Sequence, residues 1–84
     1  MRRTRLDIII NIMEEATMGV NKTSIVYRTN LNFTLADKYL DMLQKQGFIE
    51  TRSEKFKTTE KGIKFLEKAK EVAQQLEEPN LIPL

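Results

Sequence analysis

The side chains best suited to chemistry lie on a helix predicted over residues 34–46. Thr34, Lys38 and Lys45 fall on one side of this helix, opposite its apolar side, given a period of about 3.6 residues. Side chains of these types can contact base edges and phosphates when their helix lies in a major groove. The spacing therefore favours a helix that reads double-stranded DNA.

A less specific interpretation of the same surface stays open. Asp41 lies between the two lysines, and the order Lys38, Asp41, Lys45 is typical of a solvated helix that pairs charges along itself. Asp41 would repel phosphate, unless it accepts from a cytosine amino group or orients one of the lysines. The surface permits contact with DNA but does not by itself indicate it.

A basic hairpin is predicted directly after this helix, over residues 48–58, with Gly47 as the helix stop. Arg52, Lys55 and Lys57 would contact phosphates if the hairpin is the wing of a winged helix-turn-helix. Charges at a hairpin tip can also serve only to protect short edge strands. The position of the hairpin, after a helix that carries lysines, favours the wing.

Other polar residues complete the predicted set of DNA contacts. A second, short helix would present its N-terminus to phosphate. The basic arm at the start of the chain either reaches DNA or only keeps that end solvated. These further candidates are Lys22, Thr23, Arg28, Asn32, Arg2, Arg3 and Arg5.

The composition argues against catalysis and metal chemistry. The 84 residues include no cysteine and no histidine, so thiolate ligands, disulfides and the commonest general base are missing. Lys and Arg total 14 against 12 Asp and Glu, a mildly basic balance that suits a polyanionic partner. We therefore expect no enzyme activity, cofactor, metal or small-molecule ligand. With no apolar run long enough for a membrane span, we expect a cytoplasmic, nucleoid-associated protein.

The rest of the chain predicts further helices and one more strand. Thr4 is expected to cap a first helix, Thr23 or Asn21 a second, Thr34 the third and Thr59 a last helix. A third short strand is predicted near residues 20–22. The expected organisation is a winged helix-turn-helix core over residues 1–58, a C-terminal helix over 59–78 and a short tail over 79–84.

Most large apolar side chains are predicted to fill the core instead of stacking on bases, because they fall at apolar positions of their elements. They comprise the six aromatics and three methionines, namely Tyr27, Phe33, Tyr39, Phe48, Phe56, Phe65, Met13, Met18 and Met42.

A second copy of the chain is expected to cover the last helix. Apolar residues there follow the 4-3-4-3 spacing of a coiled coil, and the first helix is apolar over more than half of its circumference. The residues predicted for this homodimer interface are Leu66, Ala69, Val72, Ala73, Leu76, Ile8 and Ile12.

Two linked motifs carry a family resemblance over residues 6–76. The first is the run Tyr-Leu-x-x-Leu-x-x-x-Gly that begins at Tyr39, and the second is Lys-Thr-Thr-Glu-Lys-Gly, which begins at Lys57. In these motifs the chain resembles the small archaeal winged-helix proteins, regulator-like and chromatin-like DNA binders of about the mass of this 9.8 kDa chain. The resemblance implies a homodimer joined through the last helix, often as an antiparallel coiled coil, which places two winged domains on DNA.

The sequence thus predicts a mainly α (α+β) fold, a winged helix-turn-helix with a C-terminal dimerisation helix. The predicted function is double-stranded DNA binding by a homodimer that regulates transcription. A winged-helix module that binds protein, within a transcription or nucleoprotein assembly, is the alternative, because a fold alone does not settle function.

Overall fold

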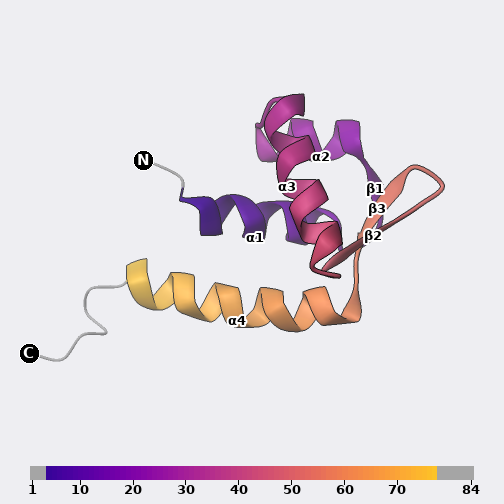
Figure 1. Ribbon diagram of the computed structural model, residues 1–84. Helices are drawn as coiled ribbons and strands as arrows, with labels where there is room; N and C mark the ends of the chain where they lie inside the picture. Colours follow the sequence, from indigo (N-terminus) through magenta and orange to yellow (C-terminus); the bar gives the residue numbers. More distant parts are fainter. Residues whose placement is uncertain (1–3, 78–84) are drawn as a thin grey trace, which may run out of the picture.

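The computed structural model describes the backbone of residues 4–77 and the side chains of residues 4–75 (Figure 1). In chain order its elements are α1 (Arg5–Glu15), β1 (Val20–Asn21), α2 (Lys22–Thr29), α3 (Phe33–Lys45), β2 (Ile49–Arg52), β3 (Lys55–Thr58) and α4 (Glu60–Glu77). This order matches the predicted one and includes the short first strand. Of these described helices, none is both long and apolar enough to cross a membrane. The predicted contacts at Arg2, Arg3 and the Leu76 side chain, and the 79–84 tail, lie outside the described residues.

Short polar side chains begin α1 and α2. Thr4 Oγ1 accepts from the Asp7 N–H at 3.1 Å, and an Asp7 carboxylate oxygen accepts from the Thr4 N–H at 3.0 Å, which is a capping box. Asn21 caps α2, where its Oδ1 accepts from the Ser24 N–H at 2.8 Å. Of the two caps proposed for α2, Asn21 is therefore the one used.

The prediction that Thr34 caps α3 is wrong. Asn32 is the cap, and its Oδ1 accepts from the Leu35 N–H at 2.7 Å. Asn30 adopts the left-handed conformation (φ 58°) at the end of α2, and the chain then turns so that Asn32 reaches an extended cap conformation. Asparagine caps helices at least as well as threonine, so Thr34 lies within the first turn and is exposed.

The sheet is antiparallel, with β3 in the centre and β1 and β2 at its edges. The register of the hairpin places Glu50 opposite Lys57 and Arg52 opposite Lys55. Its two-residue turn, Ser53 and Glu54, has positive φ angles of 52° and 64°. A turn of this kind matches the twist of the flanking strands and fixes their register. Alternate side chains of the hairpin therefore point to opposite faces of the sheet.

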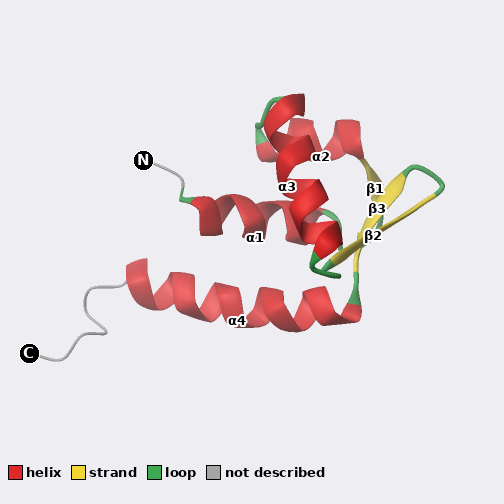
Figure 2. Ribbon diagram, viewed as in Figure 1, coloured by secondary structure: helices red, strands yellow, loops and turns green. Residues whose placement is uncertain are grey.

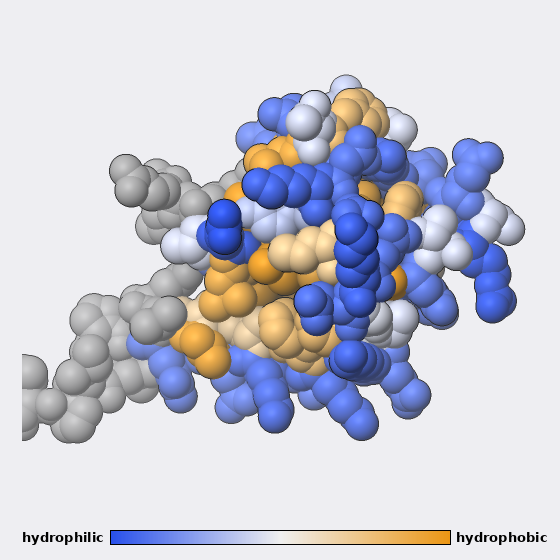
Figure 3. Space-filling model, in the orientation of Figure 1, coloured by the Kyte–Doolittle hydropathy of each residue, from blue (hydrophilic) through white to orange (hydrophobic). Residues whose placement is uncertain are grey.

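The core forms around α1, which packs against α2 and against α4 (Figure 2). Ile12, Met13 and Ile25 are among its fully buried side chains. The neighbouring face of the molecule, over α1 and α4, retains visible apolar surface (Figure 3).

Three side chains predicted for the dimer interface belong to this core instead. Ile12 is 0% exposed, and Leu66 and Ala69 are each 6% exposed. The apolar spacing of α4 does not show whether α1 or a second chain covers it. In the structure α1 packs along α4 further than the sequence predicted. Val72 is 47% exposed and remains available to a partner.

Thr58 joins the end of β3 to the end of α1. This buried residue donates from Oγ1 to the Met13 carbonyl at 2.7 Å, and its backbone N–H donates to the Ala16 carbonyl at 3.0 Å. The last carbonyls of a helix lack partners within the helix. Thr58 therefore satisfies acceptors at the end of α1 while it anchors the hairpin.

Thr59 joins the ends of α3, β2 and α4. Its Oγ1 donates to the Gly47 carbonyl at 2.6 Å and accepts from the Gly62 N–H at 3.0 Å. Its own N–H donates to the Phe48 carbonyl at 2.9 Å. A Cβ atom at Gly62 would overlap that Phe48 carbonyl, so a glycine is needed for this close approach. Thr59 therefore caps α4, as predicted.

We expect Thr58→Val to lower the free energy of unfolding by about 1–3 kcal/mol, because it keeps the side-chain shape but leaves the Met13 carbonyl without its donor. Urea denaturation followed by circular dichroism measures the change. Thr23→Val, at an exposed position, is the control and should change stability by less than about 0.5 kcal/mol. Equal losses in the two variants would contradict the anchoring role of Thr58.

Candidate nucleic-acid interface

The exposed side of α3 carries the three residues that the sequence placed there. Thr34, Lys38 and Lys45 are all exposed. The opposite side is buried, and consists of Ala36, Tyr39, Leu40 and Leu43. The helical period therefore located this surface correctly.

Both acidic residues of this surface are paired with cations of the same chain. Asp37 pairs with Lys22 at the start of α2, and Asp41 pairs with Lys45 at 3.1 Å, one turn along α3. These pairs neutralise two carboxylates that would otherwise repel phosphate, and they also engage two of the predicted DNA contacts. Within the part of the chain that the structure describes, no group of three or more carboxylates gathers to hold a metal ion.

Lys38 has no such partner. No carboxylate of residues 4–75 pairs with its ammonium group. Lys38 lines a small hollow between α1 and α3 together with Arg5, above the apolar side chains of Ile9 and Met42. Two cations from distant parts of the sequence therefore lie beside the exposed face of α3.

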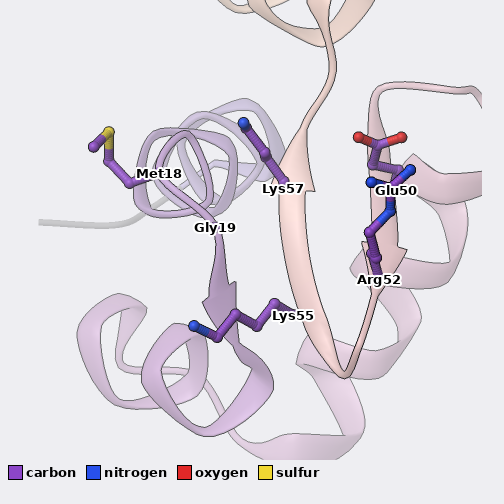
Figure 4. Close-up of a pocket in the computed structure, with 6 residues that line it drawn as sticks. All are labelled: Met18, Gly19, Glu50, Arg52, Lys55 and Lys57. Carbon is purple, nitrogen blue, oxygen red and sulfur yellow. The ribbon is translucent and has the colours of Figure 1, made fainter.

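The hairpin carries its cations on one face of the sheet. Arg52, Lys55 and Lys57 line a shallow hollow with Glu50, Met18 and Gly19 (Figure 4). All three cations are exposed, and none pairs with a carboxylate among the described side chains. The hollow therefore combines three cations with one carboxylate, and it is a positively charged surface.

The remaining predicted contacts are more constrained. Arg28 lies 3.4 Å from Glu15, at the end of α1. Asn32 uses its side-chain oxygen to cap α3, whereas Thr23 is exposed in the first turn of α2. Of these three, only Thr23 presents a side chain that no described contact engages.

Four side chains predicted for the core are exposed instead. Tyr27 and Met18 are 85% and 88% exposed, and Phe33 and Met42 are 51% and 38% exposed. Tyr27 follows the buried Ile25 by two positions, which places it on the opposite side of α2. Because the short helix α2 buries only one of its sides, the apolar character of Tyr27 does not predict its burial.

Known proteins that match this chain include a family model, one archaeal relative and one solved structure. A family model described as winged helix-turn-helix matches residues 2–77. An uncharacterized protein of Methanocaldococcus jannaschii is 38% identical over 64 residues, which cover 75% of this chain and 66% of that protein, slightly under two thirds of its length. The crystal structure of Sso10a-2, a DNA-binding protein from Sulfolobus solfataricus, matches with a TM-score of 0.76 and 28% identity. The match covers 89% of this chain and 83% of that one. These findings confirm the predicted fold and the archaeal character of the resemblance.

The Lys22–Asp37 ion pair is exposed, and we therefore expect a small coupling free energy of about 0.2–1 kcal/mol in a double-mutant cycle. Urea denaturation of Lys22→Ala, Asp37→Ala and the double variant measures it, and the value should fall at about 1 M salt. A matched cycle between Asp37 and Lys38, adjacent residues that face different ways on α3, should give a value near zero. Equal coupling in both cycles would contradict a specific link between α2 and α3.

Proposed function

This chain belongs to the winged helix-turn-helix family, and we propose that it binds double-stranded DNA and regulates transcription. In this proposal α3 enters the major groove and the β2–β3 hairpin is the wing. One observation carries the proposal: among the side chains that the structure describes, four cations without a carboxylate partner lie on the two elements with which this fold contacts DNA, namely Lys38 on α3 and Arg52, Lys55 and Lys57 on the wing.

The contacts divide into those that read bases and those that bind phosphates. Thr34 and Lys38, near the start of α3, are proposed to reach base edges or the phosphates beside them. Arg52, Lys55 and Lys57 bind phosphates from the wing. Arg5, beside Lys38, is proposed to bind phosphate as well. Weaker or indirect backbone contacts come from residues that are already paired, that cap or begin a helix, or that lie at the chain start, namely Lys22, Thr23, Arg28, Asn32, Lys45, Arg2 and Arg3.

The structural neighbour supports the proposed DNA binding. Sso10a-2 is described as a DNA-binding protein, and its likeness to this chain extends over most of both molecules. A DNA-binding role also places the protein in the cytoplasm with the nucleoid, which is part of the proposal.

We further propose that the chain acts as a homodimer joined through α4. Leu6, Phe65, Ala69 and Val72 line an apolar hollow between α1 and α4, together with Lys68. Figure 3 shows apolar atoms gathered along this side of the molecule. Leu66, Ala69 and Ile12 are almost fully buried within one chain, whereas Val72, Ala73 and Ile8 are the predicted interface residues that stay at least partly exposed. An identical chain would offer a matching apolar surface, because two-fold contacts are self-complementary.

Affinity for duplex DNA across a salt series tests the main proposal. Each phosphate contact contributes about 0.9 to the slope of log K against log salt. Lys38→Ala and Arg52→Ala should therefore each weaken binding and reduce the magnitude of that slope by about 0.9.

Lys64→Ala, which removes an exposed lysine from α4, is the matched control and should leave the slope unchanged. Affinity that ignores salt, or that is the same in all variants, would contradict DNA binding through these residues. A protein-binding module would then be the better interpretation.

Val72→Glu should shift the mass in solution from twice the 9.8 kDa chain to the chain mass, because it places a charge in the proposed apolar interface. Sedimentation equilibrium measures the mass. Val72 suits this test better than Leu66, whose replacement would disrupt the core of each chain. Lys64→Glu is the control and should stay dimeric. A wild-type protein of single-chain mass, or an unchanged mass in Val72→Glu, would contradict the proposed dimer.

A further inference from the structure

The two faces of the hairpin differ in chemistry. On one face, Ile49 and Thr58 are buried against the body and Phe56 is half-buried. The other face carries Glu50, Arg52, Lys55 and Lys57, all exposed. The strand register places these four side chains side by side on that second face, here called the outer face.

The outer face points away from the recognition helix. Gln44 of α3 donates a hydrogen bond to Thr51 Oγ1, on the inner face of β2. Thr51 and Arg52 are neighbours on one strand, so their side chains project in opposite directions. The cations of the wing and helix α3 therefore lie on opposite sides of the sheet.

Of the three cations of the wing, Lys55 and Lys57 are separated from α3 by one more strand than Arg52 is. They lie on β3, the central strand, and β2 lies between them and the helix. A straight duplex that contacts α3 would meet the edge strand β2 first. To reach the ammonium groups of Lys55 and Lys57, it must continue over the outer face of the sheet.

We propose that the duplex bends around the wing, from α3 across the edge of β2 and onto the outer face of the sheet. This inference rests on the proposed DNA binding. The charges favour such a path. On the outer face, Arg52, Lys55 and Lys57 have no carboxylate partner among the described side chains. Beside α3, by contrast, Lys22 and Lys45 are each paired with a carboxylate. Cations on one side of a duplex attract its phosphates toward the protein. The bend should be easiest at flexible pyrimidine–purine steps.

A labelled duplex tests the bend. A 20-bp duplex with a dye at each end and a central TA step is roughly 68 Å long at about 3.4 Å per base pair. A bend of about 60° at its centre would bring the ends roughly 9 Å closer. Energy transfer should therefore rise when the wild-type protein saturates the duplex.

Three variants separate the bend from simple affinity. Lys55→Ala/Lys57→Ala should bind with a salt slope smaller by about 1.8 and should leave the bound duplex nearly straight. Lys38→Ala should bind more weakly but keep the full bend at saturation. Lys64→Ala/Lys70→Ala removes two cations from α4 and should behave like the wild type.

The outcomes distinguish the two proposals. A bound duplex that is straight, or equally bent with wild type and Lys55→Ala/Lys57→Ala, overturns the bend and leaves DNA binding intact. The outer face could instead bind a second duplex. In that case each bound duplex would stay straight, and energy transfer would appear between two separately labelled duplexes and be lost in Lys55→Ala/Lys57→Ala. This result also overturns the bend. A wild-type protein that binds no duplex overturns both proposals.

Discussion

The hydroxyl of Thr58 donates to the Met13 carbonyl inside the core, and the hydroxyl of the next residue, Thr59, donates to the Gly47 carbonyl at the end of α3. These two bonds fix the point where the hairpin returns to the body. Beside them, the rings of Phe48 and Phe65 stack with their centroids 4.5 Å apart, which holds the start of β2 against α4. The directions of α3, of the wing and of α4 thus depend on one small junction.

The electrostatics of the surface follow from this arrangement. Because α2 crosses α3, Lys22 reaches Asp37, and the carboxylates of α3 no longer oppose an anionic partner. Because the hairpin register is fixed, Arg52 and Lys57 share one face instead of alternating between faces. A chain with a net charge of only +2 therefore presents, among its described side chains, four cations without a carboxylate partner on the elements proposed to contact DNA.

The sequence predicted most features that depend on neighbouring residues, although it placed the cap of α3 at Thr34 instead of Asn32. The caps at Thr4, Asn21 and Thr59, the stop at Gly47 and the exposed side of α3 all follow from local spacing, and they are confirmed. Contacts between distant elements were missed, since no spacing reveals that Lys22 meets Asp37 or that Thr58 donates to α1.

Apolar patterns gave wrong predictions where either another helix of the same chain or a second chain could cover the apolar side of a helix. Ile12, Leu66 and Ala69 looked like a dimer seam, but α1 and α4 bury these side chains within one chain. Tyr27 looked like core, but the short helix α2 turns it to solvent. The sequence identified the candidate DNA contacts. Only the structure shows which of these cations form ion pairs with carboxylates.

The salt dependence of wild-type binding to duplex DNA is the most direct test of the whole account. Five predicted contacts, Arg5, Lys38, Arg52, Lys55 and Lys57, have no carboxylate partner among the described side chains. If each binds one phosphate, the slope of log K against log salt should be about −4.5 per bound domain. A slope near zero would contradict the claim that these unpaired cations bind DNA.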